Sequence, residues 1–377
     1  MNTFLSLFYL HKGKIGRRFQ LSQEVILLNR LFAILVITGV PLVIAGAFLN
    51  WSDILMFILC CISIIGLSGY IGRATESLAI VSGPRIGGLL NATFGNAVEL
   101  IISIFTLKAG MVGIVLASLT GSVLGNLLLV LGLSFFAGGI KFKRQNFSLH
   151  DAQYNSGLLI FAVIVAFVIP EIFSMSMNTQ TTFNLSIGIA VVLIALYLAG
   201  LFFKLVTHRG VFASSDKVVE EQETPEWTKR KSILVLFLAT LTVAFVSEQL
   251  VHTFEMLGEK FGWTELFIGV IIVAIVGNAA EHVSAITMAV KNKMDVAVEI
   301  AVGSTLQVAM FVAPILVLIS LTMSEPMALV FTVPELVAMV SATFLVITLC
   351  SDGESNWFEG LILFSAYLIM AIGFYLL

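Results

Sequence analysis

The stretch Gly95–Glu99, which reads GNAVE, occurs a second time as Gly277–Glu281, which reads GNAAE, at an offset of 182 (277 against 95). The pair Gly121-Ser122 returns as Gly303-Ser304 at the same offset. Two motifs that recur at one offset indicate a duplicated unit rather than chance. Each copy of the first motif ends in a Glu, and no other Asp, Glu, Lys or Arg lies in the apolar run around it. The two glutamates are therefore the first residues to explain.

The composition is that of a membrane protein. Of the 377 residues, 59% are hydrophobic and 11% are charged, and the mean hydropathy is +1.05. A soluble domain is roughly half apolar and a quarter charged. The three cysteines, Cys60, Cys61 and Cys350, have neither the spacing of metal ligands nor that of a disulfide framework. We expect a lipid bilayer around the chain, no cofactor and no nucleic-acid partner.

Eleven apolar segments follow a leader of residues 1–30. In this leader an apolar run precedes the basic residues, which is the reverse of a signal peptide, so we expect a cytoplasmic leader. Each later segment is long enough to cross about 30 Å of hydrocarbon as a helix. The predicted spans are 31–49, 54–72, 88–107, 111–137, 155–173, 185–203, 233–251, 266–289, 297–320, 328–349 and 358–376. The fold class expected is an all-α polytopic membrane protein with 11 transmembrane helices.

The basic residues orient these spans. With the N-terminus in the cytoplasm, all of the 20 Lys and Arg residues except Lys108 and Lys260 fall on the cytoplasmic side. Such an excess is the signature of cytoplasmic loops. We therefore expect a multi-pass protein of the cell (plasma or inner) membrane, with its N-terminus in the cytoplasm and its C-terminus outside.

The first motif lies on the third span and the second on the eighth, five crossings apart, so the two copies run antiparallel. This predicts an extra helix, 31–49, followed by two inverted five-helix repeats, 54–203 and 233–377. Inverted repeats are typical of secondary transporters, whose binding site lies near the midplane of the membrane. The segment 204–231 would be an acidic cytoplasmic linker between the repeats, either merely solvated or, alternatively, weakly cation-sensing.

A carboxylate at the centre of a membrane helix costs roughly 2.5–3.5 kcal/mol on insertion scales. Glu99 and Glu281 would each be such a carboxylate. The alternative is that each glutamate is a neutral, hydrogen-bonded carboxyl in the protein core. Because two such glutamates occur at symmetry-related positions, one shared ion site is favoured. Asn96 and Asn278 precede them at i, i+3 spacing and face the same way. Two carboxylates and two amide oxygens are hard donors that suit Ca²⁺.

The second motif adds further oxygen donors. Ser122 and Ser304 could contribute hydroxyls, and Asn126 and Gln307 could contribute amides, although ordinary helix–helix hydrogen bonding is the alternative for these groups. The glycines that begin the first motif suit close approach of another helix, whereas we expect Gly121 and Gly303 to let the backbone bend as well.

Three more residues could lie on a proton path. His282 follows Glu281 and titrates near neutrality, but neighbouring helix positions point about 100° apart, so the two cannot face one site equally. Glu76 and Glu248 lie near the ends of the predicted spans 54–72 and 233–251, which are the first spans of the two repeats. Their alternative is snorkelling to the membrane surface.

These residues resemble a known family. Gly95–Glu99 with Gly121–Asn126 (GSVLGN), and Gly277–His282 with Gly303–Gln307 (GSTLQ), are similar to the two alpha-repeat signatures of the calcium/cation antiporter superfamily. The paired Gly-Asn-x-x-Glu form resembles its cation–proton exchanger branch, particularly the bacterial Ca²⁺/H⁺ antiporters. The resemblance runs from about residue 28 to the C-terminus.

This resemblance implies eleven helices, with the ion between the two alpha repeats. It also implies that Glu99 and Glu281 bind the ion and accept protons, and that Ser304 and Gln307 supply supporting oxygens. Sodium-driven relatives have a further carboxylate where this chain has Gln307, and that departure favours protons as the exchanged ion.

The expected function is therefore exchange of cytoplasmic Ca²⁺ for protons by alternating access, with Ca²⁺ and H⁺ competing for two midplane glutamates. An exchanger with broad or monovalent (Na⁺ or K⁺) selectivity is the nearest alternative, and a cation channel would share the topology. An intramembrane enzyme is disfavoured, because neither a His-Glu-x-x-His motif nor a phosphate-binding Gly-x-x-x-x-Gly-Lys-Ser/Thr loop occurs in the sequence.

Overall fold

The computed structural model describes residues 27–207 and 224–377, and nearly all of this part of the chain is helical. The two short strands β1 (Gln145–Asn146) and β2 (Glu354–Ser355) form one antiparallel pair. The expected leader, apart from residues 27–30, and residues 208–223 of the expected linker lie outside the described residues.

In the described part of the chain, eight helices are long and apolar enough to cross a membrane. They are Leu27–Leu49, Asp53–Ser82, Val112–Phe142, Leu149–Ser174, Thr179–Thr207, Lys229–Phe261, Met294–Ser320 and Trp357–Leu376. The helices Glu265–Gly277 and Ala279–Val290 meet at a bend of 61°, and the pair gives a ninth span if it crosses the membrane as one broken helix. The chain is a multi-pass membrane protein.

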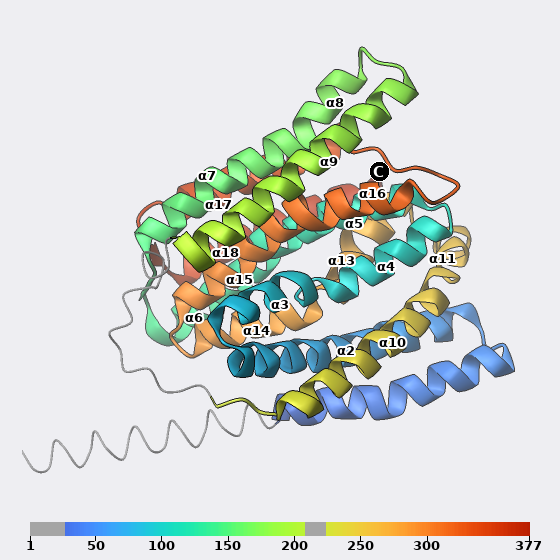
Figure 1. Cartoon of the computed structure of the whole chain (residues 1–377), viewed down its shortest axis with the longest axis horizontal. Helices are drawn as coiled ribbons and strands as arrows, with labels where there is room; N and C mark the ends of the chain where they lie inside the picture. Colours follow the sequence, from blue (N-terminus) through green and yellow to red (C-terminus); the bar gives the residue numbers. More distant parts are fainter. Residues whose placement is uncertain (1–26, 208–223) are drawn as a thin grey trace, which may run out of the picture.

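The elements carry the labels of Figure 1. The first part of the chain forms α2 (Asp53–Ser82), α3 (Pro84–Phe94), α4 (Ala97–Lys108), α5 (Val112–Leu124), the π-helical η1 (Gly125–Val130), α6 (Leu131–Phe142), α7 (Leu149–Val163), η2 (Ile164–Val168), α8 (Ile169–Ser174), α9 (Thr179–Phe202) and η3 (Phe203–Thr207). The second part forms α10 (Lys229–Val251), α11 (Phe254–Phe261), α12 (Glu265–Phe267), η4 (Ile268–Val273), α13 (Ala274–Gly277), α14 (Ala279–Val290), α15 (Met294–Gln307), η5 (Val308–Val312), α16 (Ala313–Ser320), α17 (Val333–Leu349) and α18 (Trp357–Leu376).

Two predicted spans fall on shorter helices. The predicted span 328–349 corresponds to α17, which has 17 residues. The predicted span 88–107 is not one helix, because the chain breaks between α3 and α4. The count of eleven spans and the division into two five-helix repeats stay predictions.

Asn96 and Asn278 cause the breaks. Asn96 has φ −98° and ψ 20°, and Asn278 has φ −103° and ψ 11°, which lie near the bridge region rather than in the helical region. A short amide side chain competes for backbone hydrogen bonds and tolerates this conformation better than most residues. Gly121 and Gly303, at which we expected bends, lie instead inside the continuous helices α5 and α15. That expectation was wrong.

The helices that follow the breaks correspond at the offset of the motifs. The first residue of α4 is Ala97 and that of α14 is Ala279, and both helices have 12 residues. Likewise α5 begins at Val112 and α15 at Met294. Both pairs of starting positions keep the offset that separates the two motif copies in the sequence. As a result, the two glutamates occupy the same place, the first turn of a helix that begins at a break.

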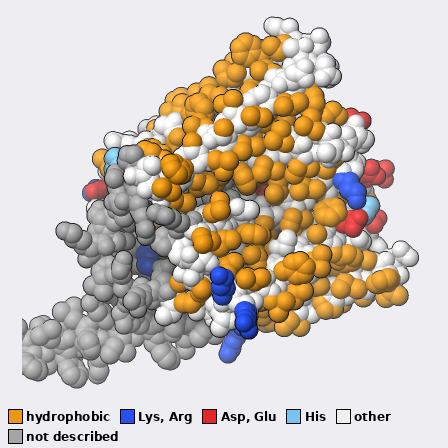
Figure 2. All heavy atoms as spheres, viewed as in Figure 1, with side chains coloured by type: hydrophobic (Ala, Val, Ile, Leu, Met, Phe, Trp, Pro, Cys, Tyr) orange, Lys and Arg blue, Asp and Glu red, His pale blue; other side chains and the backbone are white. Residues whose placement is uncertain are grey.

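The long helices run in broadly one direction, and α2 and α10 lie along one edge with the helix Leu27–Leu49 (Figure 1). Hydrophobic side chains cover most of the face seen in Figure 2, and acidic side chains lie at its left and right margins. Exposed side chains such as Ile37, Phe237 and Ile369 belong to membrane-spanning helices. A hydrocarbon environment removes the cost of exposing them.

Several segments that we predicted to be cytoplasmic meet one another. Arg144 forms an ion pair with Glu354 at 3.1 Å, and the backbone N–H of Ser148 donates to Asp295 Oδ1 at 2.5 Å. Arg73 forms a two-point ion pair with Glu226, at the end of the linker (3.0 and 3.1 Å). The contacts of Arg144 and Ser148 place the segments after α6, α14 and α17 on one side of the molecule.

Candidate functional site

Glu99 is buried in the first turn of α4, with 1% of its surface exposed. The hydroxyl of Ser122, on α5, donates a hydrogen bond to Glu99 Oε1 at 2.5 Å. Asn278, at the break before α14, donates from Nδ2 to Ser122 Oγ at 2.8 Å. A chain of hydrogen bonds therefore connects a residue of the second motif copy with the glutamate of the first.

Glu281 occupies the corresponding place in the first turn of α14 and is half-buried. The hydroxyl of Ser304, on α15, donates to Glu281 Oε2. Both Glu–Ser pairs have the same separation in the sequence. The structure thus gives the two glutamates the same type of partner from the same helical position.

The glycine of each motif lies against the glutamate of the other copy. A Cβ atom on Gly277 would lie 3.6 Å from Glu99 Cβ, and one on Gly95 would lie 3.6 Å from Glu281 Oε1. The absence of a side chain at these glycines lets each helix break approach the opposite carboxylate. The two broken helix pairs meet near the centre of the molecule (Figure 1), and the glutamates belong to one cluster.

Amide groups complete this cluster. Asn96, which is buried, donates from Nδ2 to Gln307 Oε1 at 2.6 Å. Among the described residues, neither Asn96 Oδ1 nor Glu99 Oε2 has a hydrogen-bond partner, although both atoms are buried. Unpaired buried acceptors are uncommon in proteins, and a hard cation is the kind of ligand that would satisfy them.

The ends of the broken helices add partial charges. The N-termini of α4 and α14 carry partial positive charge beside the two carboxylates, and the C-terminal carbonyl groups of α3 and α13 approach the same breaks. Such half-helix ends are a known way to bind ions inside a membrane. No group of three or more His, Cys, Asp or Glu that could hold a metal ion occurs in the described ranges, so the cluster depends on two carboxylates and neutral oxygens.

Among residues 27–207 and 224–377, the side-chain hydrogen bonds that join this cluster involve neither Asn126 in η1 nor His282 in α14. His282 Nε2 lies 3.8 Å from the position that a Cβ on Gly125 would take, so the imidazole faces η1. Within the described chain, neither His282 Nε2 nor Asn126 Nδ2 has a hydrogen-bond partner, and both are buried. Their roles in binding or proton transfer stay predictions.

Glu76 and Glu248 lie on α2 and α10, the pair of helices at the edge of the molecule. Glu76 is exposed and Glu248 is half-buried. A place for either residue on a proton or ion path also stays a prediction.

Glu335, a third buried carboxylate, was not singled out in the sequence. It is 3% exposed in the first turn of α17. Glu335 Oε2 accepts hydrogen bonds from the backbone N–H and the hydroxyl of Thr332, and Thr120 donates to Oε1 at 3.1 Å. The pattern Thr-x-x-Glu before an apolar run is a capping box, and this signal could have located the residue. These contacts cap α17 and hold it against α5.

The surroundings of the two second-motif glycines differ. A Cβ on Gly121 would collide with the carbonyl oxygen of Val270 in η4, whereas a Cβ on Gly303 would have no atom of another described helix within 4 Å. The segments that would contact the two glycines differ in the same way. In the first copy, α3 is the counterpart of η4, and Gly88 is the mate of Val270 at the motif offset. Gly88 packs against Leu205 of η3, however, and not against Gly303. The helix α5 is therefore tightly covered, and α15 is open on the equivalent face.

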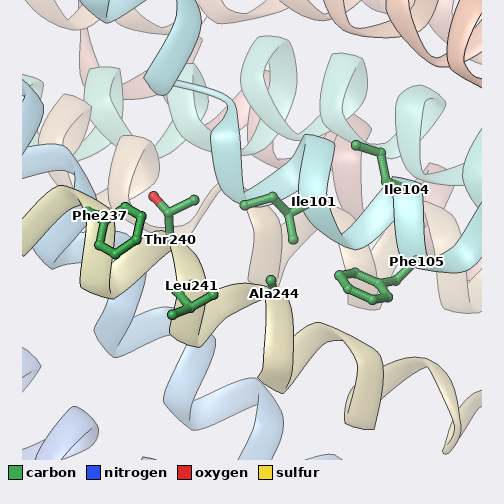
Figure 3. A pocket seen from close by; sticks show the side chains of 7 residues that line it. All are labelled: Ile101, Ile104, Phe105, Phe237, Thr240, Leu241 and Ala244. Carbon is green, nitrogen blue, oxygen red and sulfur yellow. The ribbon is translucent and has the colours of Figure 1, made fainter.

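An apolar groove between α4 and α10 is separate from the carboxylate cluster. It has a volume of about 280 Å³ and is lined by Ile101, Ile104, Phe105, Phe237, Thr240, Leu241 and Ala244 (Figure 3). Its single polar side chain is that of Thr240. The groove offers no charged group to an ion.

Known proteins resemble this chain over most of its length. The family described as sodium/calcium exchanger protein matches residues 52–206 and 231–376. The chain is 66% identical over 351 residues to a Ca²⁺/H⁺ antiporter, ChaA, of Bacillus subtilis (strain 168), covering 93% of this chain and 100% of that protein. It is 41% identical over 363 residues to a Ca²⁺/H⁺ antiporter of Synechocystis, covering 92% of this chain and 97% of the relative.

Solved structures share the fold. The structure of native YfkE superposes with a TM-score of 0.82 at 61% sequence identity, covering 92% of this chain and 100% of that one. The crystal structure of an H⁺/Ca²⁺ exchanger, CAX, gives a TM-score of 0.69 at 15% identity, covering 92% of this chain and 91% of the other. At that identity, the second likeness concerns the fold alone.

Proposed function

Because the chain belongs to the sodium/calcium exchanger protein family, we propose that it is a secondary transporter that moves Ca²⁺ out of the cytoplasm in exchange for protons. The names of its relatives, which include two Ca²⁺/H⁺ antiporters, support this choice within the family. The single observation that carries the proposal is the symmetric pair of carboxylates, Glu99 with Ser122 and Glu281 with Ser304.

Two ionised glutamates match the charge of one Ca²⁺ ion. Ca²⁺ takes six to eight oxygen ligands in flexible geometry, and the cluster offers carboxylate oxygens together with the amide oxygen of Asn96. The hydrogen bonds from Ser122 and Ser304 occupy one oxygen of each carboxylate and leave the other available. Ca²⁺ is the transported substrate here, so its residence at the site must be brief.

Protons compete with the cation for the same oxygens. When Ca²⁺ leaves, two carboxylates in one water-poor site repel each other, and protonation relieves the repulsion. Protons that arrive from one side thus displace Ca²⁺, and the site is neutral and able to return once both carboxyls are protonated. Exchange follows because the site holds either the cation or protons, but not both.

Alternating access requires a path that is open on one side at a time. The covered face of α5 and the open face of α15, seen at Gly121 and Gly303, support a state that is open along α15. The helix α15 begins after Lys291 and Lys293, on the side to which we assign the cytoplasm. In this proposal the two inverted five-helix repeats are 54–203 and 233–377. When the site becomes accessible from the other side of the membrane, the face of α15 becomes covered and that of α5 becomes open.

The test is Ca²⁺ uptake into everted vesicles of the host cell membrane with an imposed pH gradient, acid inside. We expect saturable uptake that needs the gradient and collapses when a protonophore removes it. Parallel measurements with Na⁺, K⁺ and Mn²⁺ define the selectivity. Ca²⁺ uptake equal to that of vesicles without the protein would reject the proposal, and uptake of Na⁺ or K⁺ in place of Ca²⁺ would replace it with a monovalent exchanger.

A further inference from the structure

One face of α15 leads from its first half to the carboxylate cluster. Glu299, Gly303 and Gln307 follow each other at i, i+4 spacing, so they lie on one side of the helix. Gln307 accepts the hydrogen bond of Asn96 in the cluster. The rise from Glu299 to Gln307 corresponds to roughly 12 Å along the helix axis. The face thus runs from Glu299 inward to the ion site.

No other helix of the described ranges covers this face. Glu299 is exposed, Gly303 and Gln307 are partly exposed, and no described atom beyond the helix's own backbone and the neighbours of Gly303 lies within 4 Å of a Cβ on Gly303. In contrast, the opposite side of α15 is buried, as at Ala297 and Ala301. An amide and a carboxylate on one exposed stripe fit a water-filled path better than contact with lipid tails.

Glu299 is the acidic residue on this stripe between the start of the path and the cluster. Among the described residues it has no ion pair and no side-chain hydrogen bond. Asp295, one turn earlier, is engaged by the backbone N–H of Ser148. Within the part of the chain that the structure describes, no partner neutralises the Glu299 carboxylate, so its charge can act on ions in the path.

The first copy indicates how the path along α15 could be closed, because the residue that corresponds to Glu299 is covered there. At the motif offset the counterpart is Ala117, which is fully buried on α5. A Cβ on Gly269, in η4, would collide with the Ala117 side chain. The mate of Gly269 is Gly87, in the first turn of α3. If the copies exchange arrangements, α3 would cover Glu299 as η4 now covers Ala117.

We propose that Glu299 is a cation-capture residue on the access path along α15, exposed while the path is open and covered by α3 when it closes. Its negative carboxylate attracts Ca²⁺ and raises the local Ca²⁺ concentration a few helical turns from Glu281, as charges of one sign do in a cleft. It is not a ligand of the central site. This inference deepens the proposed exchange and rests on it.

The experiment measures Ca²⁺ transport from the cytoplasmic face in everted vesicles as a function of Ca²⁺ concentration. For Glu299→Gln we expect a KM for Ca²⁺ raised by roughly three- to tenfold with kcat unchanged, because an electrostatic effect acts on capture rather than on release. The difference should shrink as ionic strength rises. Glu299→Asp, which keeps the charge, should restore most of the affinity.

The matched control is Asp352→Asn. Asp352 is exposed on the same side, in the segment joined to Gln145–Asn146, and its Oδ1 accepts the backbone N–H of Glu354, a bond that Asn can keep. The control should leave KM unchanged. An unchanged KM in Glu299→Gln, or an equal rise in both variants, would overturn the inference while wild-type exchange still supports the proposed function. Absence of exchange in the wild type would instead reject the proposed function.

Discussion

Asn278 donates a hydrogen bond to Ser122 at 2.8 Å, although the two residues are 156 positions apart. The Ser122 hydroxyl in turn donates a hydrogen bond to Glu99. This one hydroxyl therefore links the break before α14 with the carboxylate on α4. The position of Glu99 therefore depends on the second motif copy as well as on its own helix. Coupling of this kind is what an exchange site between two repeats requires.

Removal of this hydroxyl tests the link. Ser122→Ala deletes the donor to Glu99, whereas Asn278 Nδ2 keeps its bond to the carbonyl of Ala274. We expect KM for Ca²⁺ to rise several-fold because Glu99 loses its orientation, with a loss of unfolding free energy of about 1–2 kcal/mol. Ser122→Thr keeps the hydroxyl and should remain near wild type. Identical KM values in both variants would contradict the role of Ser122.

The two second-motif glycines form a matched pair. Gly121→Ala places a methyl group against the carbonyl of Val270 and should lower the unfolding free energy by about 1–3 kcal/mol. Gly303→Ala enters open space and should leave thermal stability in detergent unchanged. Its transport turnover should nevertheless fall, because Gly303 would meet α3 in the state with the path closed. Equal loss of stability in the two variants would show that both faces are covered.

Gln307 is a neutral side chain in the carboxylate cluster, and a negative charge at this position should alter the exchange of Ca²⁺ for protons. Gln307→Glu preserves the side-chain length and an oxygen for the Asn96 amide, but adds a third carboxylate to the cluster. We expect tighter cation retention and slower proton-driven release. The measurement is Ca²⁺ binding to purified protein together with turnover in vesicles. Unchanged binding and turnover would place Gln307 outside the site.

Competition between Ca²⁺ and protons gives a pH dependence with a definite sign. Protonated glutamates cannot hold Ca²⁺, so the KM measured from one side should rise as the pH of that side falls, by up to about tenfold per pH unit for each competing proton. The Asp352→Asn variant should show the same slope, because Asp352 lies in an exposed loop. A KM that is independent of pH between about pH 6 and 8 would exclude direct competition.

Local sequence patterns located much of this architecture. Hydropathy identified the long helices, and the repeated Gly-Asn-x-x-Glu motif identified the residues that meet at the centre. Those signals depend on burial in lipid and on a fixed offset between the two motif copies, both of which are visible in one sequence. The resemblance of these motifs to the alpha-repeat signatures of the calcium/cation antiporter superfamily correctly predicted the family to which the chain belongs.

Long-range packing could not be obtained in that way. Nothing in the sequence near Gly121 and Gly303 indicates that one is covered and the other open, because the difference arises from which helix of the other copy approaches. The break at Asn96 was also missed, since a long apolar run indicates a span whether or not it is continuous. The capping box marks Glu335 in the sequence, but that local signal does not reveal its bond to Thr120, which joins residues 215 positions apart.

The central claim is that Glu99 and Glu281 act as one site that holds either Ca²⁺ or protons. Glu→Gln keeps size and hydrogen bonding but removes the exchange of a charge for a proton. The decisive measurement is proton-driven Ca²⁺ flux per correctly inserted molecule for Glu99→Gln, Glu281→Gln and the double variant. We predict that either single change reduces flux to the background of vesicles without the protein, and that the double variant is no worse, as expected for residues that act as a unit. Near-normal flux per molecule in either single variant would contradict the claim and assign that glutamate a structural role.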